Sequence, residues 1–434
     1  MTTRPPVGYA EPILIVGAGV FGLSTALELK KRGFQDVTVL DRYLPPVVDG
    51  SSVDISRVIR VEYADPLYGR MAREALDGWQ GEYAETYHQS GFVMLADKVE
   101  GHSYLSKTQQ VDESLGSSLE VFEEASDVAK RYSGIQAHLG GLTAFSNPGG
   151  GWADAEASIR RLSQLCTTAG VSFVTGTRGR VLGLDIRDGT VVGVKVADGS
   201  RIPASQVILA TGAWTNRLVA VSHATSASGQ PVGFIKLTPE EARSLEGSPV
   251  IINLSTGIFC FPPTQGTNIL KIARHSYGFA TTVPTDDGAG SAPRLVSSPK
   301  RDGDNTAASY LPEDAEFALR EGLRQLLPQF ANHEWMSQRL CWYSDTPEGD
   351  FIIDHHPDLK GLFVAGGGAG HAFKFLPVLG RYIADCYENK ADMDVRQKWR
   401  LRPGLGSEGL VMKGDGSRGG PPLRTLDAHE QAKL

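Results

Sequence analysis

Six residues near the start of the chain have the types and spacing needed to hold the phosphates of a dinucleotide. Gly17-Ala18-Gly19-Val20-Phe21-Gly22 matches the GxGxxG pattern, and it follows an apolar run, Ile13 to Val16, that is typical of a buried strand. The glycines allow a tight turn and a close backbone approach to a pyrophosphate, and the helical pattern that begins at Gly22 supplies N–H donors. Asp41 ends the next apolar run, Val37 to Leu40, where a carboxylate can bind a ribose hydroxyl. The unit predicts a dinucleotide site, but it does not choose between FAD and NAD.

Two later stretches favour FAD. Two strands are predicted between Val181 and Val196 around the hairpin signal Asp188-Gly189. The run that follows them ends in Ala210-Thr211-Gly212 and resembles the second nucleotide-contacting strand of glutathione-reductase-type flavoproteins. A third apolar strand, Leu362 to Val364, leads directly into the turn Ala365 to Gly370, whose glycines let the backbone approach a ligand. A NAD enzyme rarely returns to its nucleotide site from the far end of the chain.

The elements that must position these residues are separated along the sequence. Strand–turn–helix patterns at the start, middle and end predict a discontinuous Rossmann-type FAD domain of residues 1–95, 155–220 and 335–402. Residues 96–154 and 221–334 are β-rich and are expected to form a substrate domain around a mixed sheet. The expected fold is therefore α/β in a two-domain (α+β) arrangement, with helices near 68–83, 155–169 and 375–388 and further strands at 202–209, 249–261 and 268–275. Residues 403–434 lack periodicity and are expected to be an extended tail.

Composition excludes several other classes of protein. The 434 residues are 41% hydrophobic and 21% charged with a net charge of −7, so a nucleic-acid partner is not expected. The four cysteines lie far apart without metal-ligand spacing, which argues against a metal site and a disulfide framework. No apolar run approaches the roughly 18 to 20 residues of a membrane span. The last residues, Ala432-Lys433-Leu434, are a close variant of the peroxisomal address, which a free tail would display to an import receptor. If this address is not used, we expect the protein to be located in the cytoplasm.

With these residues in place, the chain resembles the monomeric sarcosine oxidase family, which includes pipecolate, saccharopine and fructosyl-amino-acid oxidases. The resemblance covers roughly residues 12–390, and its most specific segments are Ser51–Tyr63, Lys271–His275, Cys341–His356 and Gly366–Lys374. Members of the family are FAD oxidases that convert secondary amines to imines and pass the electrons to oxygen, giving hydrogen peroxide. The resemblance implies a glutathione-reductase-type fold and a monomer.

The resemblance also implies roles for individual residues. Cys341 is expected to carry FAD through a thioether at the flavin 8α carbon, and Tyr343 to line the substrate cavity. Arg60 and Lys374 are expected to hold a substrate carboxylate, for which the guanidinium fork is suited. Further contacts to the cofactor are expected from Arg42, Ser51, Arg57, Val181, Gly212, Gly370, His371, Phe373 and Lys374.

Lys271 and His275 lie four residues apart in a run with strand character. In a strand this separation places both side chains on one face, roughly 13 Å apart. The resemblance implies that Lys271 lies over the flavin and promotes oxygen reduction, because a fixed ammonium stabilises the negative charge that forms. It implies that His275 lines the substrate side and that Asp65 orients nearby groups.

Two departures from the family leave the substrate open. Phe259 stands where sarcosine oxidase has a cavity tyrosine, with an extra residue in Phe261-Pro262-Pro263, and the segment 96–154 matches poorly. Sarcosine-, pipecolate- or saccharopine-type amines are expected, with a fructosyl-amino-acid oxidase or a biosynthetic oxidase of an N-methylated aromatic amine as alternatives. A hypothesis from another class is a non-catalytic FAD-binding scaffold. A further hypothesis is a flavin dehydrogenase that passes electrons to a protein acceptor.

Overall fold

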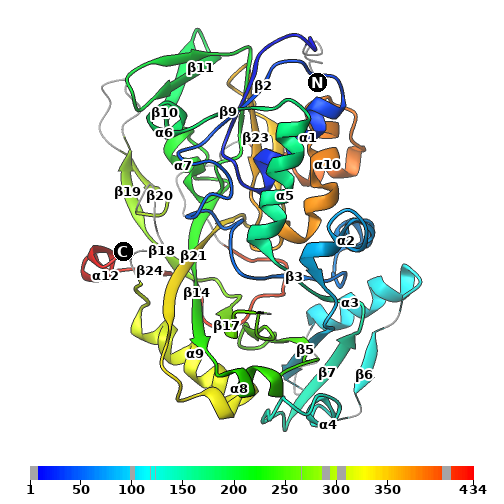
Figure 1. Ribbon diagram of the computed structural model, residues 1–434. Coiled ribbons are helices and arrows are strands. Elements are labelled where there is room, and N and C mark those ends of the chain that lie inside the picture. Colours follow the sequence, from blue (N-terminus) through cyan, green and yellow to red (C-terminus); the bar gives the residue numbers. More distant parts are fainter. Residues whose placement is uncertain are drawn as a thin grey trace.

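The computed structural model describes residues 8–97, 103–117, 119–122, 124–264, 266–285, 294–300, 309–402 and 412–434. Its elements form two groups, which two long neighbouring strands, β14 (Ser226–Lys236) and β21 (Ser337–Asp345), connect along the molecule (Figure 1). One group surrounds helix α1 (Val20–Lys31), and the other lies around helix α9 (Glu313–Leu326) at the opposite end.

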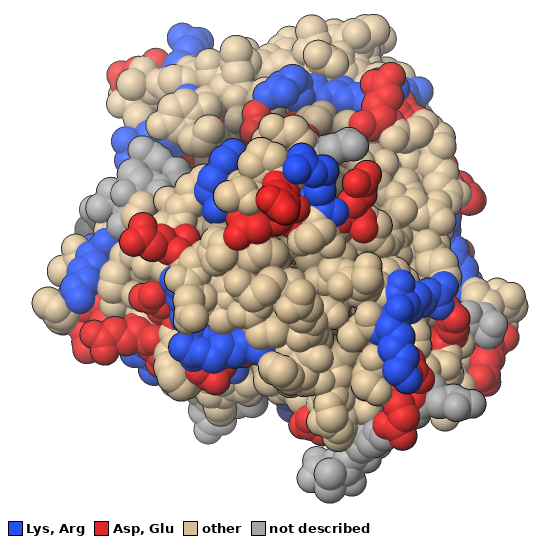
Figure 2. Space-filling model, turned by 60° about the horizontal axis from the view of Figure 1, so that its bottom comes forward, with Lys and Arg blue, Asp and Glu red and all other residues tan. Residues whose placement is uncertain are grey.

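The surface carries charges of both signs. On the face shown in Figure 2, Lys and Arg side chains are interspersed with Asp and Glu side chains, so no single sign dominates that face. Within the described ranges, no helix is long and apolar enough to cross a membrane, and no three His, Cys, Asp or Glu residues are grouped as metal ligands would be.

A six-stranded sheet forms the centre of the first group, in the order β22-β23-β13-β1-β2-β9. Its strands are β1 (Ile13–Val16), β2 (Val37–Leu40), β9 (Ser172–Val174), β13 (Gln206–Leu209), β22 (Ile352–His355) and β23 (Leu362–Gly366). All pairs except β22–β23 are parallel, and Val16 lies opposite both Leu40 and Leu209. The strands from the start, middle and end of the chain therefore finish at one edge of the sheet, which confirms the predicted Rossmann-type architecture.

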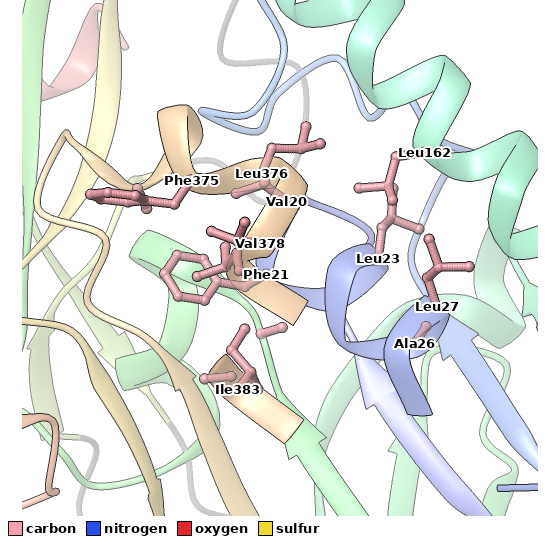
Figure 3. Close-up of a cluster of buried hydrophobic side chains, with 14 of the residues drawn as sticks. Val20, Phe21, Leu23, Ala26, Leu27, Leu162, Phe375, Leu376, Val378 and Ile383 are labelled. Carbon is pink, nitrogen blue, oxygen red and sulfur yellow. The ribbon is translucent and has the colours of Figure 1, made fainter. Parts of the chain in front are cut away.

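Helix α1 is held in place by two later helices, α5 (Ala155–Thr168) and α10 (Leu376–Tyr387). Figure 3 shows Leu23 and Leu27 of α1 on the side of Leu162, and Phe21 among Val378 and Ile383 of α10. A Cβ at Gly380 would lie 2.3 Å from the Ser24 carbonyl oxygen, so α10 can approach α1 only with glycine there.

The second group is built on a ten-stranded mixed sheet in the order β24-β18-β14-β17-β16-β15-β5-β7-β6, with β21 paired to β14. Its remaining strands are β5 (Phe92–Asp97), β6 (Glu120–Phe122), β7 (Leu142–Asn147), β15 (Val250–Asn253), β16 (Ile258–Cys260), β17 (Ile269–Arg274), β18 (Phe279–Ala280) and β24 (Arg424–Thr425). Strands β5 and β21 join this sheet although we assigned most of β5 and all of β21 to the FAD domain; the division into domains stays a prediction.

Smaller sheets and further helices complete the fold. Two three-stranded sheets contain β3 (Arg57–Ile59), β8 (Gly151–Ala153) and β4 (Tyr87–His88), and β10 (Val181–Arg187), β11 (Thr190–Val196) and β12 (Arg201–Pro203); β19 (Thr282–Thr285) pairs with β20 (Arg294–Ser297). The other helices are α2 (Pro66–Gln80), α3 (Ser103–Ser114), α4 (Asp127–Arg131), α6 (Gly176–Gly179), α7 (Thr215–Leu218), α8 (Pro239–Ser244), α11 (Met393–Lys398) and α12 (Ala428–Ala432). The run predicted as one strand at 202–209 is divided between β12 and β13.

Residues 412–434 return to the body of the molecule. Strand β24 pairs with β18, and α12 follows it. Leu434 is only 9% exposed and packs in the core around α9. The expectation of an extended, freely displayed tail is therefore wrong for these residues, whereas 403–411 lie outside the described part. Hydrophobic periodicity could not reveal this docking, because an ion pair of Arg424 with Asp314 of α9 (3.0 Å) helps to hold the segment.

Candidate active site

A cavity of about 430 Å³ runs from the edge of the six-stranded sheet to the face of the ten-stranded sheet. It brings together most of the site residues that the sequence predicted: Gly17, Gly19, Val20, Phe21, Asp41, Arg42, Ser51, Arg57, Val181, Gly212, Lys271, Cys341, Tyr343, Gly370, His371, Phe373 and Lys374. Gly22, Arg60 and His275 are not part of its lining.

The glycine turn after β1 forms one end of this cavity. Gly17 has a φ of +109°, and a Cβ there would lie 2.4 Å from the Ala210 carbonyl oxygen. A Cβ at Gly22 would lie 1.9 Å from the Gly17 carbonyl oxygen, so Gly22 acts by packing rather than by lining the cavity. The Asp41 carboxylate accepts hydrogen bonds from the backbone N–H groups of Ala18 (2.8 Å) and Arg42 (2.7 Å). The turn and the acid that follows β2 are therefore fixed to each other.

Lys271 lies in a buried cluster of charges in the middle of the site. Its side chain is 2% exposed, and its ammonium donates to the Ser56 carbonyl oxygen at 2.7 Å and lies 2.9 Å from the Asp54 carboxylate. Asp54 also pairs with Arg57 (2.5 Å) and Arg339 (3.4 Å). Burial, followed by the charge of Arg57, lowers the pKa of Lys271 to about 7, while Asp54 opposes that change. Burial raises the pKa of Asp54, but its cationic neighbours outweigh this and hold it far below its usual range.

Cys341 lies beside this cluster on strand β21. Its sulfur is 3.6 Å from an Arg57 guanidinium nitrogen, and it lines the cavity. It is a free thiol and partly exposed, whereas Cys166, Cys260 and Cys386 are buried. Cys341 is thus the cysteine that a ligand in this cavity can reach.

Arg60 and Lys374 flank one aromatic ring, that of Tyr63. The Arg60 guanidinium carbon lies 4.7 Å from the centre of the ring and the Lys374 ammonium 5.3 Å from it. Arg60 donates to the Tyr104 hydroxyl at 3.0 Å through Nη2, but its buried Nη1 has no hydrogen-bond partner among the described residues. Burial, followed by the charge of Arg60, lowers the pKa of Lys374 well below its usual range. A bound carboxylate would satisfy Nη1 and favour the charged form of Lys374.

His371 completes a chain of hydrogen bonds behind these cations. Its Nε2 donates to the Gly349 carbonyl oxygen (2.8 Å), so its Nδ1 accepts from the Tyr63 hydroxyl (3.0 Å). The Tyr63 oxygen in turn accepts from Lys374 at 3.0 Å. Burial, followed by the charge of Lys374, lowers the pKa of His371 to about 3, which keeps this imidazole neutral.

Tyr343 forms the remaining wall, and His275 lies beside Tyr343 without lining the cavity. His275 directly follows β17, and its ring centre lies 6.0 Å from that of Tyr343. A Cβ at Gly370 would lie 2.2 Å from the Tyr343 ring, so the glycine-rich turn after β23 contacts this wall. Residues 412–420, which we call the strap, cross behind it: Ser417 contacts His275, and the Arg418 guanidinium lies 5.9 Å from the centre of the Tyr343 ring.

Comparisons with known proteins agree with this geometry. Residues 12–386 match the family described as DAO, FAD dependent oxidoreductase. The chain belongs to this family. It is 31% identical to L-saccharopine oxidase of Schizosaccharomyces pombe over 91% of this chain and 93% of that one. It is 28% identical to a monomeric sarcosine oxidase of Bacillus sp. (strain NS-129), over 86% and 91% of the two chains. The solved structure of fructosamine oxidase (Amadoriase II) from Aspergillus fumigatus superposes with a TM-score of 0.83 at 29% identity, covering 97% and 96%. These matches confirm the predicted resemblance.

The residues of this FAD-dependent oxidoreductase fit the cofactor of its family. A side chain at Gly17 would fill the turn that approaches a pyrophosphate, and Asp41 follows β2 at the same edge of the sheet. At the other end, the Phe259 and Phe261 rings (centres 5.6 Å apart) and Lys271 line the same cavity as Cys341. This gives an apolar wall and a cation where the flavin ring is expected.

Several residues of the site were missed by sequence reasoning. Asp54 sits three residues before Arg57 in a matched segment, and its charge among apolar neighbours was an available signal. Tyr104, which holds Arg60, lies in the segment 96–154 that matched poorly. The strap residues gave no periodic signal. Asp65 caps α2 by accepting from the backbone of Leu67 (2.9 Å) and pairs with Lys398 (2.8 Å), so its contacts are those of a helix cap.

Proposed function

We propose that this FAD-dependent oxidoreductase oxidises the secondary amine of an N-alkyl or cyclic amino acid to an imine and uses oxygen as the acceptor. One observation carries the proposal: the buried Arg60 Nη1 has no hydrogen-bond partner among the described residues, and Lys374 lies over the same Tyr63 ring. A buried guanidinium with a free donor costs free energy unless a ligand satisfies it. A carboxylate is the group that guanidinium binds with two parallel hydrogen bonds. The relatives named for sarcosine and saccharopine support an amino acid of this kind.

In this proposal, one set of residues binds the substrate and another assists the reduction of oxygen. When bound, FAD supplies the chemistry of accepting a hydride equivalent and of delivering electrons to oxygen. Arg60 and Lys374 fix the carboxylate, so that the amine lies toward His275 and Tyr343. Lys271, held by Asp54, provides a fixed positive charge for the negative charge that develops as oxygen is reduced. Positioning and preorganised charge supply the rate enhancement, and no strong base is needed.

We also propose that Cys341 binds FAD covalently. Its place in the cavity lining supports this, because a flavin bound there can reach its sulfur, to which Arg57 donates at 3.6 Å. A bond to the flavin 8α carbon would replace the thiol hydrogen and one methyl hydrogen, and the two electrons released would reduce oxygen to peroxide. Acid precipitation of the holoenzyme should leave flavin in the pellet, and Cys341→Ser should release it. Flavin found wholly in the wild-type supernatant would exclude the linkage.

The substrate can be found by an anaerobic screen. Sarcosine, pipecolate, saccharopine, fructosyl amino acids and N-methylated aromatic amino acids are mixed with the holoenzyme, and bleaching of the flavin is followed before air is admitted. After the sarcosine-, pipecolate- and saccharopine-type amines, N-methylated aromatic amino acids are the next candidate substrates, because the aromatic rings of Phe259 and Phe261 line the cavity. Peroxide after admission of air is expected. If no amine bleaches the flavin, the proposed activity fails and a scaffold is favoured; a slow return of colour favours a dehydrogenase.

For localisation, we propose that Ala432-Lys433-Leu434 is read by a peroxisomal import receptor. Because Leu434 packs against the core, α12 must detach before the receptor can bind. A fluorescent protein fused in front of the full chain should collect in peroxisomes, and removing the three residues should leave it in the cytoplasm. Diffuse fluorescence from the intact fusion would reject the proposal.

A further inference from the structure

The strap is tied to the molecule by polar contacts along its length. The backbone N–H groups of Lys413 and Gly414 both donate to the Pro347 carbonyl oxygen at 2.9 Å. Arg418 is 8% exposed and forms a two-pronged pair with Asp345 at 2.8 and 2.5 Å. A Cβ at Gly419 would lie 2.3 Å from the Gly257 nitrogen, so the backbones touch. These contacts fix the strap beside His275 and Tyr343.

Two strap residues form a hydrogen-bonded relay to His275. The Asp415 carboxylate accepts from the backbone N–H (3.0 Å) and from the hydroxyl (2.5 Å) of Ser417. The Ser417 oxygen lies 3.1 Å from His275 Nε2. Because the hydroxyl hydrogen of Ser417 is directed to the carboxylate, its oxygen can only accept from the imidazole. Nε2 of His275 therefore carries a hydrogen, and Nδ1 does not when the ring is neutral.

The surroundings of His275 keep the ring neutral. Burial, followed by the charge of Arg418, lowers its pKa well below the usual range; Arg60 and Lys374 act in the same direction, and Asp415 opposes them. Tyr343, the other titratable group against the ring, is neutral because burial raises its pKa. Within the described part of the chain, Nδ1 of His275 has no hydrogen-bond partner. His275 thus keeps an unpaired acceptor next to Tyr343, which lines the cavity.

We propose that Ser417 and Asp415 are positioning residues that hold His275 as the Nε2–H tautomer, so that Nδ1 accepts a hydrogen bond from the N–H of a neutral secondary amine. The inference rests on the proposed function. A neutral secondary amine has one N–H and one lone pair, and it must keep the lone pair free to lose a hydride equivalent. Directing the N–H to Nδ1 leaves the lone pair available and fixes the orientation of the amine. A tertiary amine has no N–H and gains nothing from this arrangement.

The test compares Ser417→Ala, which removes the relay, with Ser417→Thr, which keeps the hydroxyl. Anaerobic flavin reduction is followed in stopped flow with a matched pair of substrates, an N-methyl and an N,N-dimethyl amino acid. Loss of one hydrogen bond predicts about a tenfold lower reduction rate constant for the secondary amine in S417A, no change for the tertiary amine, and rescue in S417T. Tyr277→Phe is the control, because it loses a strap contact (the hydrogen bond to the Lys413 carbonyl oxygen, 3.1 Å) that is not part of the relay.

A second readout does not depend on turnover. Imidazole ¹⁵N chemical shifts of labelled protein distinguish the two tautomers, and the His275 signals are assigned by their loss in His275→Asn. The Nε2–H form is expected in wild type, S417T and Y277F, and a mixture or the Nδ1–H form in S417A.

Three results would overturn the inference. They are an unchanged tautomer in S417A, an equal loss for both amines, or a Y277F variant as slow as S417A. If no secondary amine bleaches the wild-type flavin, it is the proposed function that fails, and the tautomer measurement still decides whether the relay exists.

Discussion

Replacing Asp54 by asparagine should remove the charge that keeps Lys271 protonated. The two groups are 2.9 Å apart and buried. At an effective dielectric constant of about 20, unit charges at that distance attract by about 6 kcal/mol, which corresponds to about 4 pKa units. The other cations around Asp54 can move when its charge is removed, which offsets part of the lost attraction. We therefore expect the pKa of Lys271 to fall by about 2 units. The pKa of Lys271 would then move from about 7 to ~5.

The sign of the pH effect follows from the charge that assists the reaction. The ammonium of Lys271 is present below its pKa, so wild-type reoxidation by oxygen should be fastest at low pH and fall as pH rises through about 7. In D54N the fall should occur through ~5, which makes the variant about 50-fold slower at neutral pH. The enzyme is reduced by light without amine and mixed with aerated buffer in stopped flow. Lys271→Met should be slow at every pH, and D54N/K271M should match it. A D54N profile with the wild-type inflection would refute the reasoning.

Three other changes have outcomes that the contacts predict. Arg60→Lys replaces the fork by a single ammonium and should raise KM for carboxylate substrates about tenfold or more in steady-state assays; an unchanged KM would place the carboxylate elsewhere. Gly17→Ala places a methyl 2.4 Å from the Ala210 carbonyl oxygen, so the purified variant should lose FAD on gel filtration, and retention of the full flavin absorbance would contradict this. Arg418→Met leaves Asp345 buried without its partner and should lower the free energy of unfolding by about 3 to 5 kcal/mol in urea titrations; an unshifted midpoint would show that the pair contributes nothing.

The parts of the fold that the sequence predicted are those specified by nearby residues. The first strand, the glycine turn and α1 lie within residues 13–31, and their signal is hydrophobic spacing followed by a turn that only glycine fits. The strands near 207 and 362 were recognisable as buried strands in the same way. Their assembly at one edge then follows from the general rule for parallel sheets with helical crossovers.

The missed residues depend on contacts between distant segments. Asp54 and Lys271 are far apart in sequence and meet only when the two sheets pack, so spacing contains no information about their pair. Tyr104 reaches Arg60 from a helix in a poorly matched segment. The strap is polar and glycine-rich, a composition that usually indicates an unpacked chain, and its docking follows from its fit to Asp345 and Pro347. Such complementarity exists only on a folded surface.

The position of the strap has a consequence for biosynthesis. Residues 412–420 leave the ribosome after every other residue of the site, including the glycine turns, Lys271 and Cys341. If Ser417 orders the amine-binding wall, a nascent or truncated chain could bind its cofactor without the full means of using it. Efficient oxidation, and the peroxide that follows from it, would then begin only after residues 412–420 have been synthesised and have folded back onto the molecule.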